Sequence, residues 1–250
     1  MITRKIFPSR SRSLITGHRG FIGSHLMETL EDAIGWDVKE GKNILFTNTN
    51  ERLDYIFHFA ATVSIVDANA DPLASEINNV LGTIRLLDLA RKTGARFIFA
   101  SSSAVGQNIP YGIQKQACEA YIEFYHRNYG VKYTILRYFN VFGERMRPDL
   151  AIPVWLEQRS RGEALTVRGD GSMKRDYIYV GDAVKKTLAL KDTLGTFEVG
   201  SGIDHTTLEV ARTISDKIKF VPEEVGEMKS TKSKSATPTL DVIKWLKELV

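Results

Sequence analysis

Short apolar segments alternate along this chain with longer segments whose apolar residues recur at helical spacing. The apolar segments are expected to be strands, at residues 13–16, 33–36, 55–61, 97–100 and 133–138. Helices are expected between them, from Phe21 to Leu30, in the stretch after Asp71-Pro72, and from Tyr111 to Tyr129. Because strands that are apolar on both faces are typical of a parallel sheet covered by helices on both sides, the pattern predicts an α/β fold.

The alternation becomes less regular from about residue 145. A polar, glycine-rich stretch at 168–172 precedes two further strand-like segments, 177–180 and 197–200, and residues 240–249 have the spacing of a closing amphipathic helix. We therefore expect a large domain at 1–146, to which 175–202 return, and a small C-terminal domain at 147–250.

Composition narrows the classes of protein that fit. The 250 residues carry a net charge of +4, and the basic residues are scattered, which argues against nucleic acid as a partner. The longest mainly apolar stretch, 56–66, is too short to span a membrane. The single cysteine, Cys118, excludes an intramolecular disulfide and favours a cytoplasmic setting. Two basic clusters near the chain ends are expected to be solvated tails: Arg4, Lys5, Arg10 and Arg12, and Lys229, Lys232 and Lys234.

A glycine-rich turn follows the first expected strand. Gly17, Gly20 and Gly23 stand between that strand and a helix, where glycine permits a sharp turn and the close approach of a pyrophosphate to backbone N–H groups. Asp37 ends the second expected strand, where a carboxylate can accept hydrogen bonds from ribose hydroxyls. The turn predicts a Rossmann-type, doubly wound parallel sheet that binds a dinucleotide.

The choice of dinucleotide stays open at this point. The carboxylate of Asp37 favours NAD, because it would repel the 2′-phosphate of NADP. Arg19, Lys39 and Lys42 lie close enough in the sequence to favour NADP instead.

Candidate chemistry lies after the fourth expected strand. Ser102 is followed by Tyr111 and Lys115, and a spacing of four residues places the last two on one face of a helix. A lysine ammonium there can lower the pKa of the phenol and prepare it to remove a proton from an alcohol. By contrast, the five histidines show no metal-ligand spacing, so we expect no metal.

The motifs together resemble the extended short-chain dehydrogenase/reductase family of nucleotide-sugar epimerases and dehydratases. The resemblance covers residues 13–202 and rests on segments that follow one another in the family's order: 16–26, 57–61, 79–83, 101–103, 111–115, 136–143 and 175–180. It implies a Rossmann domain that binds NAD and a small C-terminal domain that binds a nucleoside-diphosphate sugar.

The resemblance also implies residue roles. Ser102 would hydrogen-bond the reacting hydroxyl, Tyr111 would be the acid/base, and Lys115 would hold the nicotinamide ribose; Ser103 is the alternative to Ser102. Substrate contacts are expected at Ser102, Ser103, Asn140 and Arg175. Cofactor contacts are expected at Gly17, Arg19, Gly20, Phe21, Ile22, Gly23, Asp37, Asn43, Ile44, Phe59, Ala60, Ala61, Asn79, Ala100, Ser101, Tyr111, Lys115, Tyr138, Asn140 and Val141.

The kind of reaction is inferred from the residues that follow Ser102. Members that dehydrate the sugar have an acidic residue there, whereas this chain has Ser103, Ala104 and Val105. Inversion at C4 through a transient 4-keto sugar is therefore expected. The alternatives are a nucleotide-sugar reductase or dehydratase, and a dinucleotide-binding protein without catalysis.

Two departures from the family's pattern bear on the substrate. The loop before Tyr111 is short, and Glu224 stands where relatives have an arginine that binds the diphosphate. The family also implies a homodimer formed by the helix after Asp71 and the helix that carries Tyr111.

Overall fold

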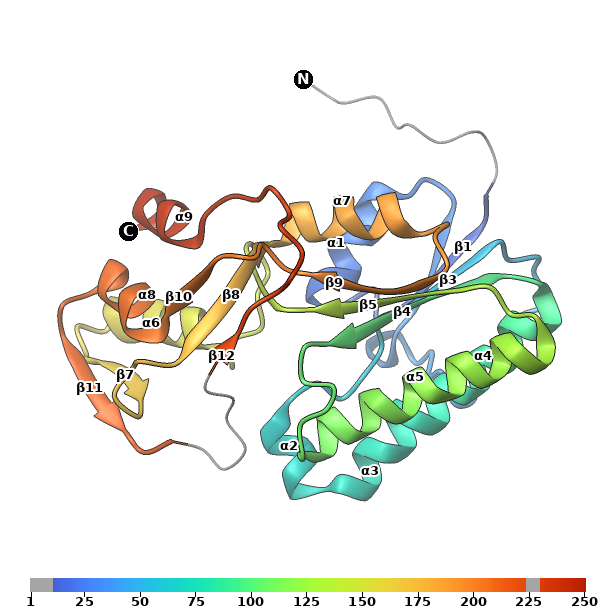
Figure 1. The fold of residues 1–250 in the computed structure, drawn as a ribbon, viewed down its shortest axis with the longest axis horizontal. Helices are drawn as coiled ribbons and strands as arrows, with labels where there is room; N and C mark the ends of the chain where they lie inside the picture. The colour runs from blue at the N-terminus through green and yellow to red at the C-terminus, as the bar shows by residue number, and fades with distance from the viewer. Residues whose placement is uncertain (1–10, 224–229) are drawn as a thin grey trace. The chain divides into compact units, whose positions relative to one another are not determined.

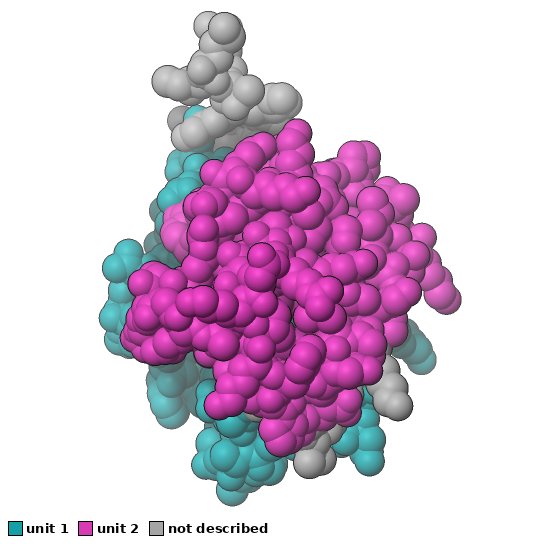
Figure 2. Space-filling model, turned by 90° about the vertical axis from the view of Figure 1, so that its left-hand side faces the viewer, with its two compact units in different colours: residues 1–136, 189–197 teal, residues 137–188, 198–250 magenta. Residues whose placement is uncertain are grey.

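The computed structural model describes residues 11–223 and 230–250. The chain divides into two compact units (Figure 2): unit 1, residues 1–136 and 189–197, and unit 2, residues 137–188 and 198–250. The boundary falls before the expected one at 146, and the segment that returns to unit 1 is shorter than the expected 175–202. Among the described residues, no helix is both long and apolar enough to cross a membrane.

The main sheet has the strand order β2-β1-β3-β4-β5-β9. Its strands are β1 (Ser13–Thr16), β2 (Ala33–Trp36), β3 (Tyr55–His58), β4 (Arg96–Ser102), β5 (Tyr133–Tyr138) and β9 (Gly195–Val199). β1 pairs in parallel with β2 and β3, so that Thr16 lies opposite both Trp36 and His58. The strand order reverses at β1, and the carboxyl ends of β1 and β3 therefore mark the edge where a Rossmann sheet binds its ligand.

Helices cover both faces of this sheet, as predicted (Figure 1). α1 (Phe21–Thr29) lies on one face, and α4 (Gly82–Thr93) and α5 (Pro110–Tyr129) lie on the other. The remaining helices of unit 1 are η1 (Val38–Glu40), α2 (Ile65–Ala70), α3 (Pro72–Glu76) and the π-helix η2 (Ile77–Leu81). The core between α4, α5 and the sheet is built from Leu86, Leu87, Phe97, Phe99 and Ile122.

The expected strands are confirmed, with one shortened. The strand expected at 55–61 ends at His58, because the backbone of residues 59–60 turns against Gly17. The outer strand β2 is only four residues long, and the Nζ of Lys42 donates to its Gly35 carbonyl at 3.3 Å. A short strand with a lysine across its free side is protected against pairing with another chain.

Unit 2 is built around one central strand. β8 (Lys174–Tyr179) pairs with β6 (Asn140–Phe142), β10 (Asp204–Thr206) and β12 (Ser230–Thr231), and β7 (Leu165–Arg168) pairs with β11 (Ile218–Val221). The helices are α6 (Ala151–Ser160), α7 (Val180–Leu190), α8 (Thr207–Ile214) and α9 (Val242–Leu249). The closing helix expected at 240–249 is thus confirmed, and it buries Val242 and Leu246 against Trp155 and Val210.

Candidate active site

The glycine-rich turn is packed too tightly for any other residue at two positions. Gly17 has φ 73°, and a β-carbon there would lie 2.7 Å from the backbone nitrogen of Ala60. A β-carbon on Gly23 would lie 2.3 Å from the Gly17 carbonyl oxygen. Gly20 is the N-cap residue of α1, and no side chain caps the N–H groups of the first helical turn. This arrangement suits an anionic group such as a pyrophosphate.

Asp37 lies beside this turn and is 8% exposed. Its Oδ2 accepts a hydrogen bond from the backbone N–H of Arg19 at 3.1 Å, and its Oδ1 accepts one from the backbone N–H of Lys39 at 3.0 Å. The Nε of Arg19 lies 3.3 Å from the carboxylate of Glu40. The Nζ of Lys42 is bound to a strand carbonyl. The basic groups that favoured NADP in the sequence therefore have partners, and the fixed carboxylate suits the ribose hydroxyls of NAD.

Asn43 and Ile44, both predicted cofactor contacts, follow Asp37 in a turn. Oδ1 of Asn43 accepts from the Leu45 N–H at 2.8 Å. Ile44 is 3% exposed, and its side chain lies over Gly82, where a β-carbon would be 2.5 Å from Cδ1. The Ile44 side chain thus packs under the start of α4.

Asn79, another predicted cofactor contact, lies in the π-helix and is 2% exposed. Its Oδ1 accepts from the Thr62 N–H at 2.7 Å, and its Nδ2 donates to Thr62 O and to Gln114 Oε1. Gln114 in turn donates to Ser75 at 2.7 Å. The Asn79 side chain therefore joins η2 to the residue just before Lys115 on α5.

The structure brings the end of β4 and the start of α5 together. Ser102 is the last residue of β4, and its Oγ accepts from the Ala104 N–H at 3.1 Å. A β-carbon on Gly112 would lie 2.5 Å from the Ala104 carbonyl oxygen. Since Ala104 is two residues from Ser102 and Gly112 adjoins Tyr111, the short loop closes as a compact turn.

Lys115 lies on the same face of α5 as Tyr111 and is 4% exposed. Its Nζ donates to the Ala100 carbonyl at 2.8 Å, and it lies 4.6 Å from the ring centroid of Phe99 and 5.8 Å from that of Tyr111. Burial lowers the pKa of Lys115 to about 8, against the opposing effects of Cys118 and Glu119. The Lys115 amine and the Tyr111 ring thus lie on one face of α5, as their spacing implies, and their roles in catalysis stay a prediction.

Glu119 is a buried residue of α5 that was not among the predicted site residues. It is 7% exposed, and the hydroxyl of Ser101 donates to its Oε1 at 2.6 Å. Its position in the sequence could have identified it, because Tyr111, Lys115 and Glu119 are spaced by four residues along α5 and therefore share one face.

Two predicted substrate contacts lie in unit 2. Nδ2 of Asn140 donates to the Asp176 carbonyl at 2.9 Å and to Thr231 Oγ1 at 3.1 Å. Arg175 precedes Asp176 on β8, and its guanidinium donates to the Lys174 carbonyl at 3.0 Å. Of the residues expected to contact the cofactor, Tyr138 is buried, and its hydroxyl bonds to Thr187 Oγ1 at 2.5 Å. Glu224 lies outside the described residues.

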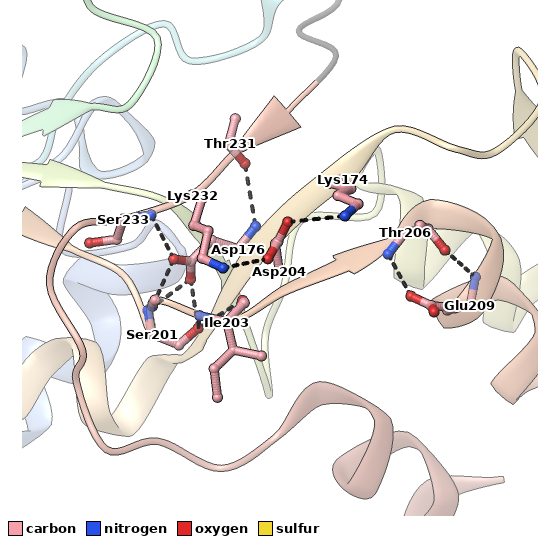
Figure 3. A network of polar contacts seen from close by, with 11 residues as sticks. Lys174, Asp176, Ser201, Ile203, Asp204, Thr206, Glu209, Thr231, Lys232 and Ser233 are labelled. Carbon is pink, nitrogen blue, oxygen red and sulfur yellow. Dashed lines mark hydrogen bonds and ion pairs between the residues drawn. The ribbon is translucent and has the colours of Figure 1, made fainter.

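Asp176 organises this region of unit 2 (Figure 3). Its fully buried carboxylate accepts hydrogen bonds from Ser201 N and Oγ at 2.7 Å, from Gly202 N at 2.8 Å and from Ser233 N at 2.9 Å. One side chain thus connects β8 to two other segments of unit 2.

The prediction of a solvated tail around Lys232 and Lys234 is wrong. Thr231 and Ser233 are buried, and Lys232 lies 3.0 Å from Asp204 (Figure 3). The segment is held because Asp176 and the β8 backbone bind its alternate residues. Of the other basic residues expected in tails, Arg12 pairs with Glu51 at 2.7 Å. Arg4, Lys5, Arg10 and Lys229 lie outside the described residues.

A Rossmann sheet with a glycine-rich turn and an acidic residue after β2 defines a dinucleotide-binding protein, and the Tyr/Lys pair on α5 is its candidate acid/base site. Residues 13–200 match the NAD dependent epimerase/dehydratase family. The chain belongs to this family, which confirms the resemblance found in the sequence.

Individual relatives cover most of the chain. It is 30% identical to UDP-glucuronic acid decarboxylase 6 of Arabidopsis thaliana, over 86% of this chain and 76% of the relative. It is also 30% identical to a putative UDP-glucose 4-epimerase of Methanocaldococcus jannaschii, over 85% and 84%.

Among solved structures, a mutant UDP-glucuronic acid 4-epimerase of Bacillus cereus, in complex with UDP-4-deoxy-4-fluoro-glucuronic acid and NAD, is similar with a TM-score of 0.87. The identity is 26%, and the match covers 94% of this chain and 96% of that one.

Proposed function

We propose that this protein is an NAD-dependent epimerase that inverts C4 of a nucleoside-diphosphate sugar through a transient 4-keto sugar. The observation that carries the proposal is the buried Lys115 amine, fixed on the Ala100 carbonyl and facing the ring of Tyr111. The relatives named as 4-epimerases support the choice of reaction.

The residues of unit 1 fit NAD. The uncapped first turn of α1 would hold the pyrophosphate, and Asp37 would accept from the adenosine ribose. Bound NAD would accept a hydride from C4 and later return it. We assign dinucleotide binding to unit 1 and, through Asn140 and Arg175, substrate binding to unit 2.

The protein's own groups supply the proton transfers. Tyr111 removes the proton of the C4 hydroxyl, and the positive charge of Lys115 stabilises the phenolate that does so. The Ser102 oxygen accepts a hydrogen bond from the Ala104 N–H, and its hydroxyl proton is donated to the reacting oxygen of the sugar. When the hydride returns to the opposite face of the 4-keto sugar, Tyr111 returns the proton.

A test starts from UDP-glucose, UDP-glucuronate and their N-acetylated relatives, with products resolved by NMR. At least one C4 epimer is expected, without net change in NADH absorbance. Tyr111→Phe should abolish the reaction, whereas Tyr121→Phe, an exposed tyrosine on the same helix, should not. A Tyr111→Phe enzyme with wild-type turnover would refute the mechanism.

One relative favours a second candidate, decarboxylation of UDP-glucuronate. Oxidation at C4 places a ketone β to the C6 carboxylate, which makes loss of CO₂ chemically accessible from the same intermediate. Release of CO₂ from UDP-glucuronate, with no C4 epimer formed, would identify this activity instead.

A homodimer is also proposed. Exposed apolar side chains gather on α3, η2 and the adjacent α5: Leu73, Ile77, Leu81, Ile113, Tyr121 and Phe124. A second copy of the same helices would remove this surface from water, as in a four-helix interface.

The buried free thiol of Cys118 fits a reducing compartment, and we propose the cytoplasm.

A further inference from the structure

Glu119 continues the face of α5 that carries Tyr111 and Lys115, one helical turn further along. Its carboxylate is almost fully removed from solvent, and the Ser101 hydroxyl donates to it at 2.6 Å. Ser101 is itself only 3% exposed. A carboxylate buried in this way is costly unless it has hydrogen bonds and a nearby positive charge.

β4 binds this face of the helix at two successive residues. The Ala100 carbonyl accepts from Lys115 Nζ, and the next residue, Ser101, holds Glu119. Both side chains of the helix are thus positioned by the same strand, directly before Ser102. A displacement of Glu119 would therefore be transmitted to the lysine through the helix and through β4.

Two neighbouring groups, Cys118 and then Glu119, raise the pKa of Lys115 against the larger effect of burial, and Glu119 is the carboxylate of the two. On α5, the Tyr111 ring lies 5.8 Å from the amine, and the thiol of Cys118 and the carboxylate of Glu119 act on the amine electrostatically. Burial raises the pKa of the Cys118 thiol, so this thiol is uncharged at neutral pH.

Within the described residues, no acidic group from another element is among those that act on the pKa of Lys115. From β3, His58 is held neutral, because burial and then the charge of Lys115 lower its pKa to about 3. From β4, the Phe99 ring and the Ala100 carbonyl contribute only a quadrupole and a dipole. Glu76 on α3 acts on the Cys118 thiol.

We propose that Glu119, held by Ser101, is a positioning residue that keeps the Lys115 amine protonated and aligned with Tyr111 over the pH range in which Tyr111 works. This inference rests on the proposed function for its kinetic consequence. Its electrostatic consequence can be measured without any substrate.

The experiment follows Lys115 itself. The full-length protein is labelled with ¹³Cε-lysine and titrated by NMR, and the Lys115 signal is identified by its loss in Lys115→Arg. Glu119→Gln keeps the side-chain size and an acceptor for Ser101 but removes the charge. Glu123→Gln, an exposed glutamate one turn further that pairs with Arg127, is the matched control.

The wild-type midpoint is expected near pH 8. Glu119→Gln should lower it by about one unit, the effect of removing one nearby opposite charge, and Glu123→Gln should leave it unchanged. The alkaline limb of the kcat profile should shift with the NMR midpoint. Ser101→Ala, which releases the carboxylate, should shift both in the same direction by less.

An unchanged Lys115 midpoint in Glu119→Gln and in Ser101→Ala would overturn the inference. A shifted midpoint in a protein that epimerises no sugar would instead refute the proposed function and leave the coupling of Glu119 to Lys115 supported. The two failures are therefore distinguishable.

Discussion

The hydroxyl of Thr16 donates a 2.8 Å hydrogen bond to Nδ1 of His58, which joins the ends of β1 and β3 through an imidazole that is 1% exposed. On the other side of the ring, Nε2 lies 3.0 Å from the hydroxyl of Thr83. That hydroxyl donates to the Asn79 carbonyl at 2.6 Å, so it accepts the Nε2 proton. The chain of bonds requires a neutral imidazole with its proton on Nε2.

This arrangement predicts acid sensitivity. Because the pKa of His58 falls from 6.5 to about 3 on folding, the unfolded chain binds one more proton between these values, and stability falls as pH drops through that window. The loss is about 2.5 kcal/mol between pH 7 and pH 4.5. Urea unfolding should show this difference, and His58→Gln, which does not titrate, should lack it. Equal acid slopes in the two proteins would contradict the assignment.

A second prediction concerns the compact turn between Ser102 and Tyr111. The β-carbon of Gly112→Ala would meet the backbone oxygens of Ala104 and Gln107 at 2.5 and 2.8 Å, so the turn must move. A displacement of about 1 Å next to the reacting groups is expected to lower kcat by about a hundredfold.

The control for this prediction is Gly106→Ala in the same turn. Gly106 has φ 88° and no atom within 4 Å of a β-carbon, so the substitution introduces backbone strain without a clash. It should cost about 1 kcal/mol in urea unfolding and leave kcat near the wild-type value. Equal turnover in the two variants would show that the contact with Gly112 does not position the site.

The sequence predicted the strands and the Tyr/Lys pair because local patterns determine them. Apolar runs gave β1 to β5, and the four-residue spacing placed Lys115 beside the ring of Tyr111. The π-helix at 77–81 was not predicted, since its residues continue the amphipathic pattern of the helices around it. The contacts of Asn79 with Thr62 and Gln114 come from segments distant in sequence.

The prediction of a solvated tail after residue 229 was wrong for a related reason. Its serine, threonine and lysine residues have the composition of a solvated tail. Its order depends on the buried carboxylate of Asp176, which the sequence showed only as the neighbour of Arg175. Buried Thr231 and Ser233 alternate with exposed Lys232 and Lys234, which is the period of a strand.

A third prediction concerns the choice between NAD and NADP. Glu40 pairs with Arg19 at 3.3 Å, and Glu40→Gln would release the guanidinium for a 2′-phosphate. Because an exposed pair is worth at most about 1 kcal/mol, the affinity for NADP relative to NAD should rise about three- to fivefold at low salt and less at high salt.

Calorimetric titration of both dinucleotides measures this ratio without catalysis. Glu163→Gln, which removes one exposed carboxylate from unit 2, controls for the change in net charge. A ratio that changes equally in both variants would mean that Arg19 does not read the 2′-position.

The last prediction tests the helical dimer. Ile77 on η2 and Phe124 on α5 are exposed apolar residues of the proposed interface. Replacing both by lysine would place two ammonium groups per subunit in a buried surface, at a cost of several kcal/mol. Light scattering should find a dimer for the wild type and a monomer for the double variant. Phe220→Lys, an exposed apolar residue on β11 of unit 2, should remain dimeric. A monomeric wild type at micromolar concentration, or a dimer that survives both lysines, would place the contact elsewhere.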